Sequence, residues 1–144
     1  MKRPAGVTAL TFFFLAGCAA SGISSLSLLN PGGFLELMWR LNPRARVVFA
    51  GMGGWGVLLL AAVCAACGLA AAGLWRGRRW GYGLAAGLIA ANLIGDAVNG
   101  ALGTEPRALA GVPVAAALLF YLSSRRVREF FRENRGVPPP PPDG

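Results

Sequence analysis

The chain has 144 residues, of which 55% are hydrophobic and only 14% are charged, and its formal net charge is +8. A soluble domain typically holds about 25% charged residues because its surface must be solvated, so this composition excludes an ordinary soluble domain. The chain contains no histidine, which removes His-dependent triads and His metal sites; we predict no enzyme and no cofactor. The basic residues flank apolar runs, so we expect them to meet anionic lipid headgroups and not nucleic acid.

Four apolar runs are candidates for membrane-spanning helices. A helix needs about 20 predominantly apolar residues to cross about 30 Å of hydrocarbon. The sequence therefore predicts an all-α fold, a transmembrane four-helix bundle, within a single membrane domain of residues 1–135. The predicted spans are residues 5–29, 47–75, 80–102 and 106–124.

The first span has two interpretations. Behind Lys2 and Arg3 the apolar run continues to Leu29, which favours a retained helix. Residues 15–18 also resemble a lipoprotein lipobox, and processing there would lipidate Cys18 and remove the preceding helix. The retained helix is preferred, because a signal peptide does not need the apolar stretch that follows Cys18.

Residues 33–41, between the first two spans, are predicted to form a short amphipathic helix in the outer interface. In this segment Glu36 and Arg40 lie four residues apart, as in a helical ion pair, and Trp39 is expected to act as an interfacial anchor. A cap over the outer end of the bundle is preferred to a lid over a cavity.

The second span is expected to begin as a juxtamembrane stretch. Asn42 and Pro43 are typical of an N-cap followed by proline at the first helical position. The glycines among residues 51–56 are expected to loosen or bend the helix near its entry. Cys64 and Cys67 lie near the middle of this span, where a thiol stays protonated and unreactive, so we interpret them as small packing residues.

The third span carries a carboxylate, Asp96, which is a functional-site candidate because charge within a membrane is costly. Asn92, Asp96 and Asn99 share one helical face. If hydrocarbon begins near Tyr82, Asp96 lies about 21 Å in, towards the outer surface. The preferred interpretation is a structural ion pair with Arg107 or with an arginine of the first outer loop. The alternative is an ion or substrate site.

The same helix carries a stripe of small residues at four-residue spacing: Gly83, Gly87, Ala91 and Gly95. Small residues let two helix backbones approach closely, so the stripe predicts a helix–helix contact. A contact within the chain is preferred to a contact with another copy.

Residues 125–135 are predicted to form a basic helix suited to an anionic lipid surface, and residues 136–144 a disordered proline-rich tail. With both termini on one side, ten of the Lys and Arg residues fall on that side and four on the other. Because positive charge is retained inside, we expect a bacterial cytoplasmic (inner) membrane protein, multi-pass, with both termini cytoplasmic.

Four short segments resemble small four-span bacterial integral membrane proteins that carry no assigned function. They are residues 39–43 (WRLNP), 68–81 (ending LWRGRRWG), 92–96 (NLIGD) and 121–128 (YLSSRRVR). The resemblance implies location and fold only.

Three functional classes stay open. The preferred one is a noncatalytic membrane component, such as a scaffold, an assembly factor or a subunit that contacts a membrane protein partner or another copy of itself. The second is a small oligomeric transporter or channel that uses Asp96 and its neighbouring asparagines. The last is a membrane thiol oxidoreductase that uses Cys64 and Cys67.

Overall fold

The computed structural model describes residues 4–103 and 110–133. Within these ranges the chain is helical and contains no strand. In chain order the elements are α1 (Ala5–Leu29), the 3-10 helix η1 (Phe34–Arg40), α2 (Pro43–Gly51), α3 (Gly54–Trp75), α4 (Arg79–Ala101), α5 (Gly111–Ser123) and α6 (Arg125–Glu133).

Three of these helices, α1, α3 and α4, are long and apolar enough to cross a membrane, whereas the apolar helix α5 has 13 residues. Fewer than a third of the residues in the apolar window of each long helix are buried, so their outer surfaces are apolar too, as lipid requires. Exposed tryptophans lie at both ends of α3, at Trp55 and Trp75. The 20 residue steps from Trp55 to Trp75 correspond to about 30 Å of helix, the thickness of a hydrocarbon core.

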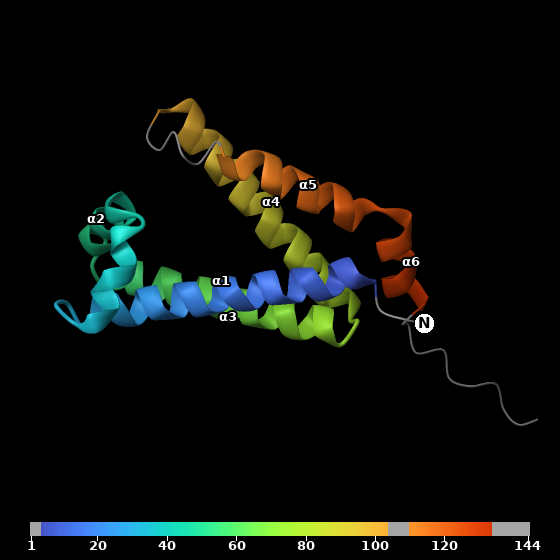
Figure 1. Cartoon of the computed structure of the whole chain (residues 1–144), viewed down its shortest axis with the longest axis horizontal. Coiled ribbons are helices and arrows are strands. Elements are labelled where there is room, and N and C mark those ends of the chain that lie inside the picture. Colours follow the sequence, from blue (N-terminus) through green and yellow to red (C-terminus); the bar gives the residue numbers. More distant parts are fainter. Residues whose placement is uncertain (1–3, 104–109, 134–144) are drawn as a thin grey trace, which may run out of the picture.

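The four apolar helices α1, α3, α4 and α5 form two pairs that meet at one end and diverge at the other (Figure 1). In the first pair α1 packs along α3, and in the second α5 runs back along α4. The start of α1, the α3–α4 turn and α6 lie at the end where the pairs meet, which we call the joined end. The opposite end, where α2 lies, is the open end. A closed four-helix bundle is therefore not observed among the described residues.

The joined end holds the common core. It contains Val7, Leu10 and Phe14 of α1, together with residues of α3, α4, α5 and α6. These residues are Ala70, Ala71 and Leu74 of α3, Ala85 and Ile89 of α4, Ala115 and Leu122 of α5, and Val127, Phe130 and Phe131 of α6. Tyr82 of α4 ties this end together, since its hydroxyl donates to the carbonyl of Leu122 at 3.1 Å and its ring centroid lies 5.3 Å from that of Phe131.

The α3–α4 turn places two glycine backbones in contact. Gly77, at φ 64°, ends α3, and the N–H of Arg78 donates to the carbonyl of Gly73 at 2.9 Å. This is the Schellman arrangement that satisfies the last carbonyls of a helix. A Cβ on Gly73 of α3 would collide with the backbone of α4, and a Cβ on Gly81 of α4 would collide with the backbone of α3. The close crossing of α3 and α4 therefore depends on both glycines.

The predicted second span, residues 47–75, is divided in the structure. Its N-terminal signal is confirmed, because Asn42 caps α2 by accepting from the N–H of Ala45 at 3.1 Å and Pro43 opens the helix. However, α2 ends at Gly51, and Gly53, at φ 58° and ψ −134°, redirects the chain into α3. That backbone conformation is essentially restricted to glycine, so the expected bend is a full break.

The C-terminal helix was predicted from its basic residues, and α6 spans Arg125–Glu133. Its apolar residues are buried against the joined end, whereas Arg125, Arg128 and Arg132 are exposed. Residues 134–135 and the predicted proline-rich tail, 136–144, lie outside the described residues, as do residues 106–109 of the predicted fourth span.

Candidate functional site

The polar cluster predicted on the third span is present on α4. The amide Nδ2 of Asn92 donates to Oδ2 of Asp96 at 2.9 Å, so the two side chains point to the same side of the helix. Asn99 lies one turn further along and is exposed. The cluster occupies the C-terminal half of α4, which runs towards the open end.

An apolar cleft of about 550 Å³ lies between the two helix pairs. The apolar helices α1, α3, α4 and α5 all contribute to its walls. The lining residues are Phe13, Phe14 and Gly17 of α1, Val63 and Cys67 of α3, Leu88, Ile89, Ala91 and Asn92 of α4, and Gly111, Val114, Ala115 and Leu118 of α5. A volume of this size is typical of small-molecule sites in proteins.

Asp96 lies at the edge of this cleft. It is bonded to Asn92, which lines the cleft, and it packs against Gly111, which lines the cleft from α5. A Cβ on Gly111 would come within 2.5 Å of the Asp96 carboxylate, so the absence of a side chain there makes room for the carboxylate. The cleft thus combines apolar walls with one polar corner.

The predicted ion pair of Asp96 is not found within the described part of the chain. Arg46 of α2, one of the arginines that the sequence offered as a partner, pairs with Glu36 instead. Arg107, the other predicted partner, lies outside the described residues. The interpretation of Asp96 as half of a structural salt bridge therefore stays a prediction.

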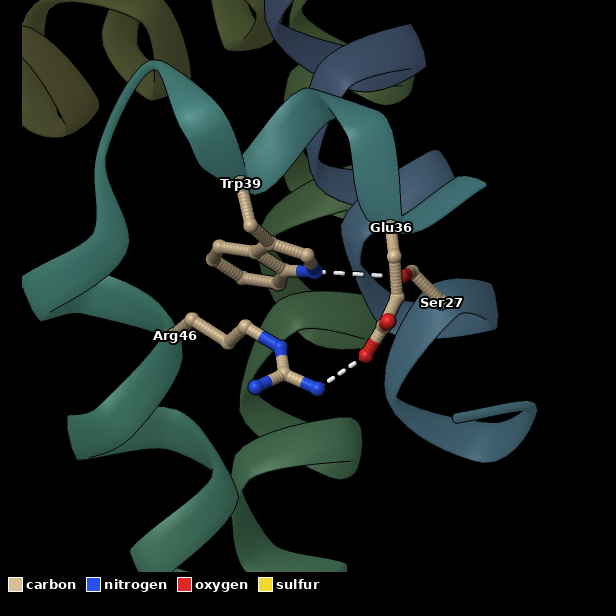
Figure 2. A network of polar contacts seen from close by, with 4 residues as sticks. All are labelled: Ser27, Glu36, Trp39 and Arg46. Carbon is tan, nitrogen blue, oxygen red and sulfur yellow. Dashed lines mark hydrogen bonds and ion pairs between the residues drawn. The ribbon is translucent and has the colours of Figure 1, made fainter. Parts of the chain in front are cut away.

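The segment after α1 forms a cap on the open end of the first helix pair (Figure 2). Trp39 is 7% exposed, and its indole N–H donates to the hydroxyl of Ser27 at 3.0 Å. Glu36 pairs with Arg46 of α2 and not with Arg40. The predicted Glu36–Arg40 pair is therefore replaced by a pair with Arg46. Trp39 is buried against α1, and its role as an interfacial anchor stays a prediction.

The preferred interpretation of this segment as a cap agrees with the structure. No residue of η1 or α2 lines the cleft, so this part of the chain does not cover it. Phe34 and Leu41 are almost fully exposed, at 87% and 85%, and they supply the apolar outer surface expected of an interfacial segment.

Sequence reasoning missed the serines of α1 that form hydrogen bonds with the cap and with α3. Ser25 donates to the carbonyl of Val57 in α3 at 3.1 Å, and Ser27 accepts from Trp39. Together with Ser21 and Ser24 these residues are buried on α1. The signal was available, since four serines within seven residues of an otherwise apolar span indicate hydrogen bonding between helices.

The small-residue stripe makes no close helix–helix contact within the described residues. A Cβ on Gly83, Gly87 or Gly95 would meet no atom within 4 Å, and Ala91 is exposed. The helix contact expected within the chain is absent there; α4 instead packs through Gly81, Ala85 and Ile89, which are buried. The stripe is an open face of the molecule.

The three cysteines gather between α1 and α3. The sulfur of Cys18 lies 3.4 Å from that of Cys64, and Cys67 contacts the same interface near Gly17. Cys18 stands in the middle of a continuous α1, and removal of the preceding residues would delete Val7, Leu10 and Phe14 from the core. This packing favours the retained helix, while lipidation of Cys18 stays a prediction.

Comparison with known proteins found no match: no protein-family model, no curated protein and no solved structure matches the chain. The resemblance to small four-span bacterial membrane proteins accordingly stays a prediction from the sequence.

Proposed function

We propose that this protein is a noncatalytic component of the bacterial inner membrane, with four spans and both termini in the cytoplasm, which packs against a second membrane protein or a second copy of itself. The four-span topology is supported by the alternating direction of α1, α3, α4 and α5. The orientation is supported by six exposed arginines at the joined end: Arg76, Arg78, Arg79, Arg125, Arg128 and Arg132. Clustered basic residues favour the cytoplasmic side and its anionic lipids.

The observation that carries this proposal is the open face of α4. In its stripe, a Cβ on Gly83, Gly87 or Gly95 would meet no atom within 4 Å among the described residues, and Ala91, which borders the cleft, is exposed. In lipid, small residues give a helix a surface on which another helix can approach closely and gain van der Waals contact. The fold leaves this surface unused, so a partner helix within the bilayer is its natural complement.

The test enlarges the small residues and measures the state of association. Gly83→Leu and Gly87→Leu place a bulky side chain on the proposed contact face, and Ala65→Leu, on the exposed face of α3, is the matched control. After mild solubilisation we expect the wild type and the control to migrate as a complex heavier than the 14.9 kDa monomer. We expect both glycine variants to lose that complex. A monomeric wild type, or glycine variants that keep the complex, would contradict the proposal.

A second function, a small transporter or channel, is favoured by a different observation, the cleft with Asn92 and Asp96 at its polar corner. Intramembrane carboxylates commonly mark substrate or ion pathways. In proteoliposomes, a proton or organic-cation flux that disappears in Asp96→Asn, with the melting temperature retained, would support this function. A flux equal to that of empty liposomes would contradict it.

A further inference from the structure

The cleft between the helix pairs carries an imbalance of charge. Between residues 5 and 103 the sequence contains two acidic residues, Glu36 and Asp96. Glu36 is paired with Arg46 in the cap, whereas Asp96 has no ion pair among the described residues. An ionised Asp96 would place a negative charge at the edge of an apolar cavity, and no cation among the described residues pairs with it.

The walls of the cleft suit a compact organic group. Phe13 and Phe14 line it, with their ring centroids 5.5 Å apart in an edge-to-face arrangement. The faces of aromatic rings attract cations. The remaining wall is formed mainly by aliphatic side chains and small residues. The cleft is thus chemically matched to a molecule with an apolar body and one positive charge.

We propose that this cleft binds a lipophilic monovalent organic cation, whose apolar groups fill the space between the helix pairs and whose charge is neutralised by Asp96. A phospholipid is a poorer complement, because its phosphate would face the carboxylate. The inference rests on the cleft and not on transport: a bound cation without flux would remove the transport function and leave this proposal intact.

The experiment compares two ions of nearly equal size and shape but opposite charge, tetraphenylphosphonium and tetraphenylborate. The full chain is reconstituted in nanodiscs, and binding is measured by equilibrium dialysis after subtraction of empty nanodiscs. We expect one saturable site for the phosphonium cation and no saturable binding of the borate anion. Because this comparison uses the wild type, it holds even if a variant fails to fold.

Two variants then locate the site. Asp96→Asn removes the charge, and we expect the cation to bind about tenfold more weakly or worse, the loss of a partly screened ionic attraction at close range. Val114→Trp fills the cleft and is expected to abolish binding, whereas Ala117→Trp, an exposed position on α5 outside the cleft, is expected to leave it unchanged.

Several results would overturn the proposal. They are the absence of saturable cation binding to the wild type, equal saturable binding of cation and anion, unchanged cation affinity in a folded Asp96→Asn protein, and equal loss of binding in Val114→Trp and Ala117→Trp.

Discussion

Two glycines two residues apart on α4 give opposite predictions for the same substitution. Gly81 is buried at the α3–α4 crossing, where a Cβ would collide with the backbone of Gly73 and Leu74. Gly83 lies on the open face, where a Cβ would meet no atom within 4 Å. Both positions are helical, so Gly81→Ala and Gly83→Ala change the same chemistry in two different environments.

The magnitudes follow from the two environments. Alanine is favoured over glycine in a helix by up to about 1 kcal/mol, a gain that Gly83→Ala can realise in full. At Gly81 the added methyl forces two backbones apart, and such overpacking costs about 1–3 kcal/mol. Because the helix preference is common to both variants, their free energies of unfolding are expected to differ by about 1–3 kcal/mol.

The assay is the melting temperature in one detergent together with a reversible dodecyl sulfate titration, which gives the free energy of unfolding. We expect Gly83→Ala to melt at or above the wild-type temperature and Gly81→Ala clearly below it. Equal behaviour of the two variants would refute the close crossing of α3 and α4. A destabilised Gly83→Ala would show that the stripe is packed, within the monomer or against the proposed partner helix, and its melting temperature in a detergent that gives monomers separates the two cases.

Three further predictions concern the cap and the α1–α3 interface. Trp39→Phe removes the donor to Ser27 and is expected to destabilise the fold by about 1 kcal/mol. Adding Ser27→Ala is then expected to change the melting temperature little further, whereas additive losses would contradict the hydrogen bond between the two side chains. Gly53→Ala is expected to lower the melting temperature because its backbone conformation is restricted to glycine, costing about 1–3 kcal/mol, and an unchanged value would refute the break between α2 and α3. Iodine, an apolar oxidant that enters hydrocarbon, is expected to link Cys18 to Cys64 with release of two molecules of hydrogen iodide, since their sulfurs are 3.4 Å apart although both thiols are protonated there. The gel shift of the linked chain should vanish in Cys64→Ala, and its absence in the wild type would argue against this interface or against a free thiol at position 18.

The helices themselves were largely predictable from sequence. Apolar length predicted α1, α3 and α4, and local chemistry predicted the start of α2, because Asn42 and Pro43 act within a single turn. The shared face of Asn92 and Asp96 followed from helical periodicity alone. These features depend on neighbours close in sequence, which is why they are readable without a structure.

The arrangement of the helices was not predictable in the same way. Periodicity identifies a face of small residues but does not say which of two faces is used, and α4 packs through Gly81, Ala85 and Ile89 and not through the Gly83 stripe. Glu36 had two arginines within reach, Arg40 by helical spacing and Arg46 by folding, and the direction of the cap selects Arg46. The cleft likewise arises from the divergence of the helix pairs, which no local pattern encodes.

The divergence of the two helix pairs is the central claim, because it creates the cleft beside Asp96. It is tested most directly by spin-label distances in nanodiscs, in a background with the native cysteines replaced by alanine. One label pair, at Ala5 and Ser123, reports on the joined end. The other pair, at Leu29 and Leu102, reports on the ends of α1 and α4 at the open end. All four positions are exposed. We predict a clearly longer distance at the open end. In a parallel bundle neighbouring axes stay about 8–10 Å apart along their length, so similar distances at both ends would contradict the account.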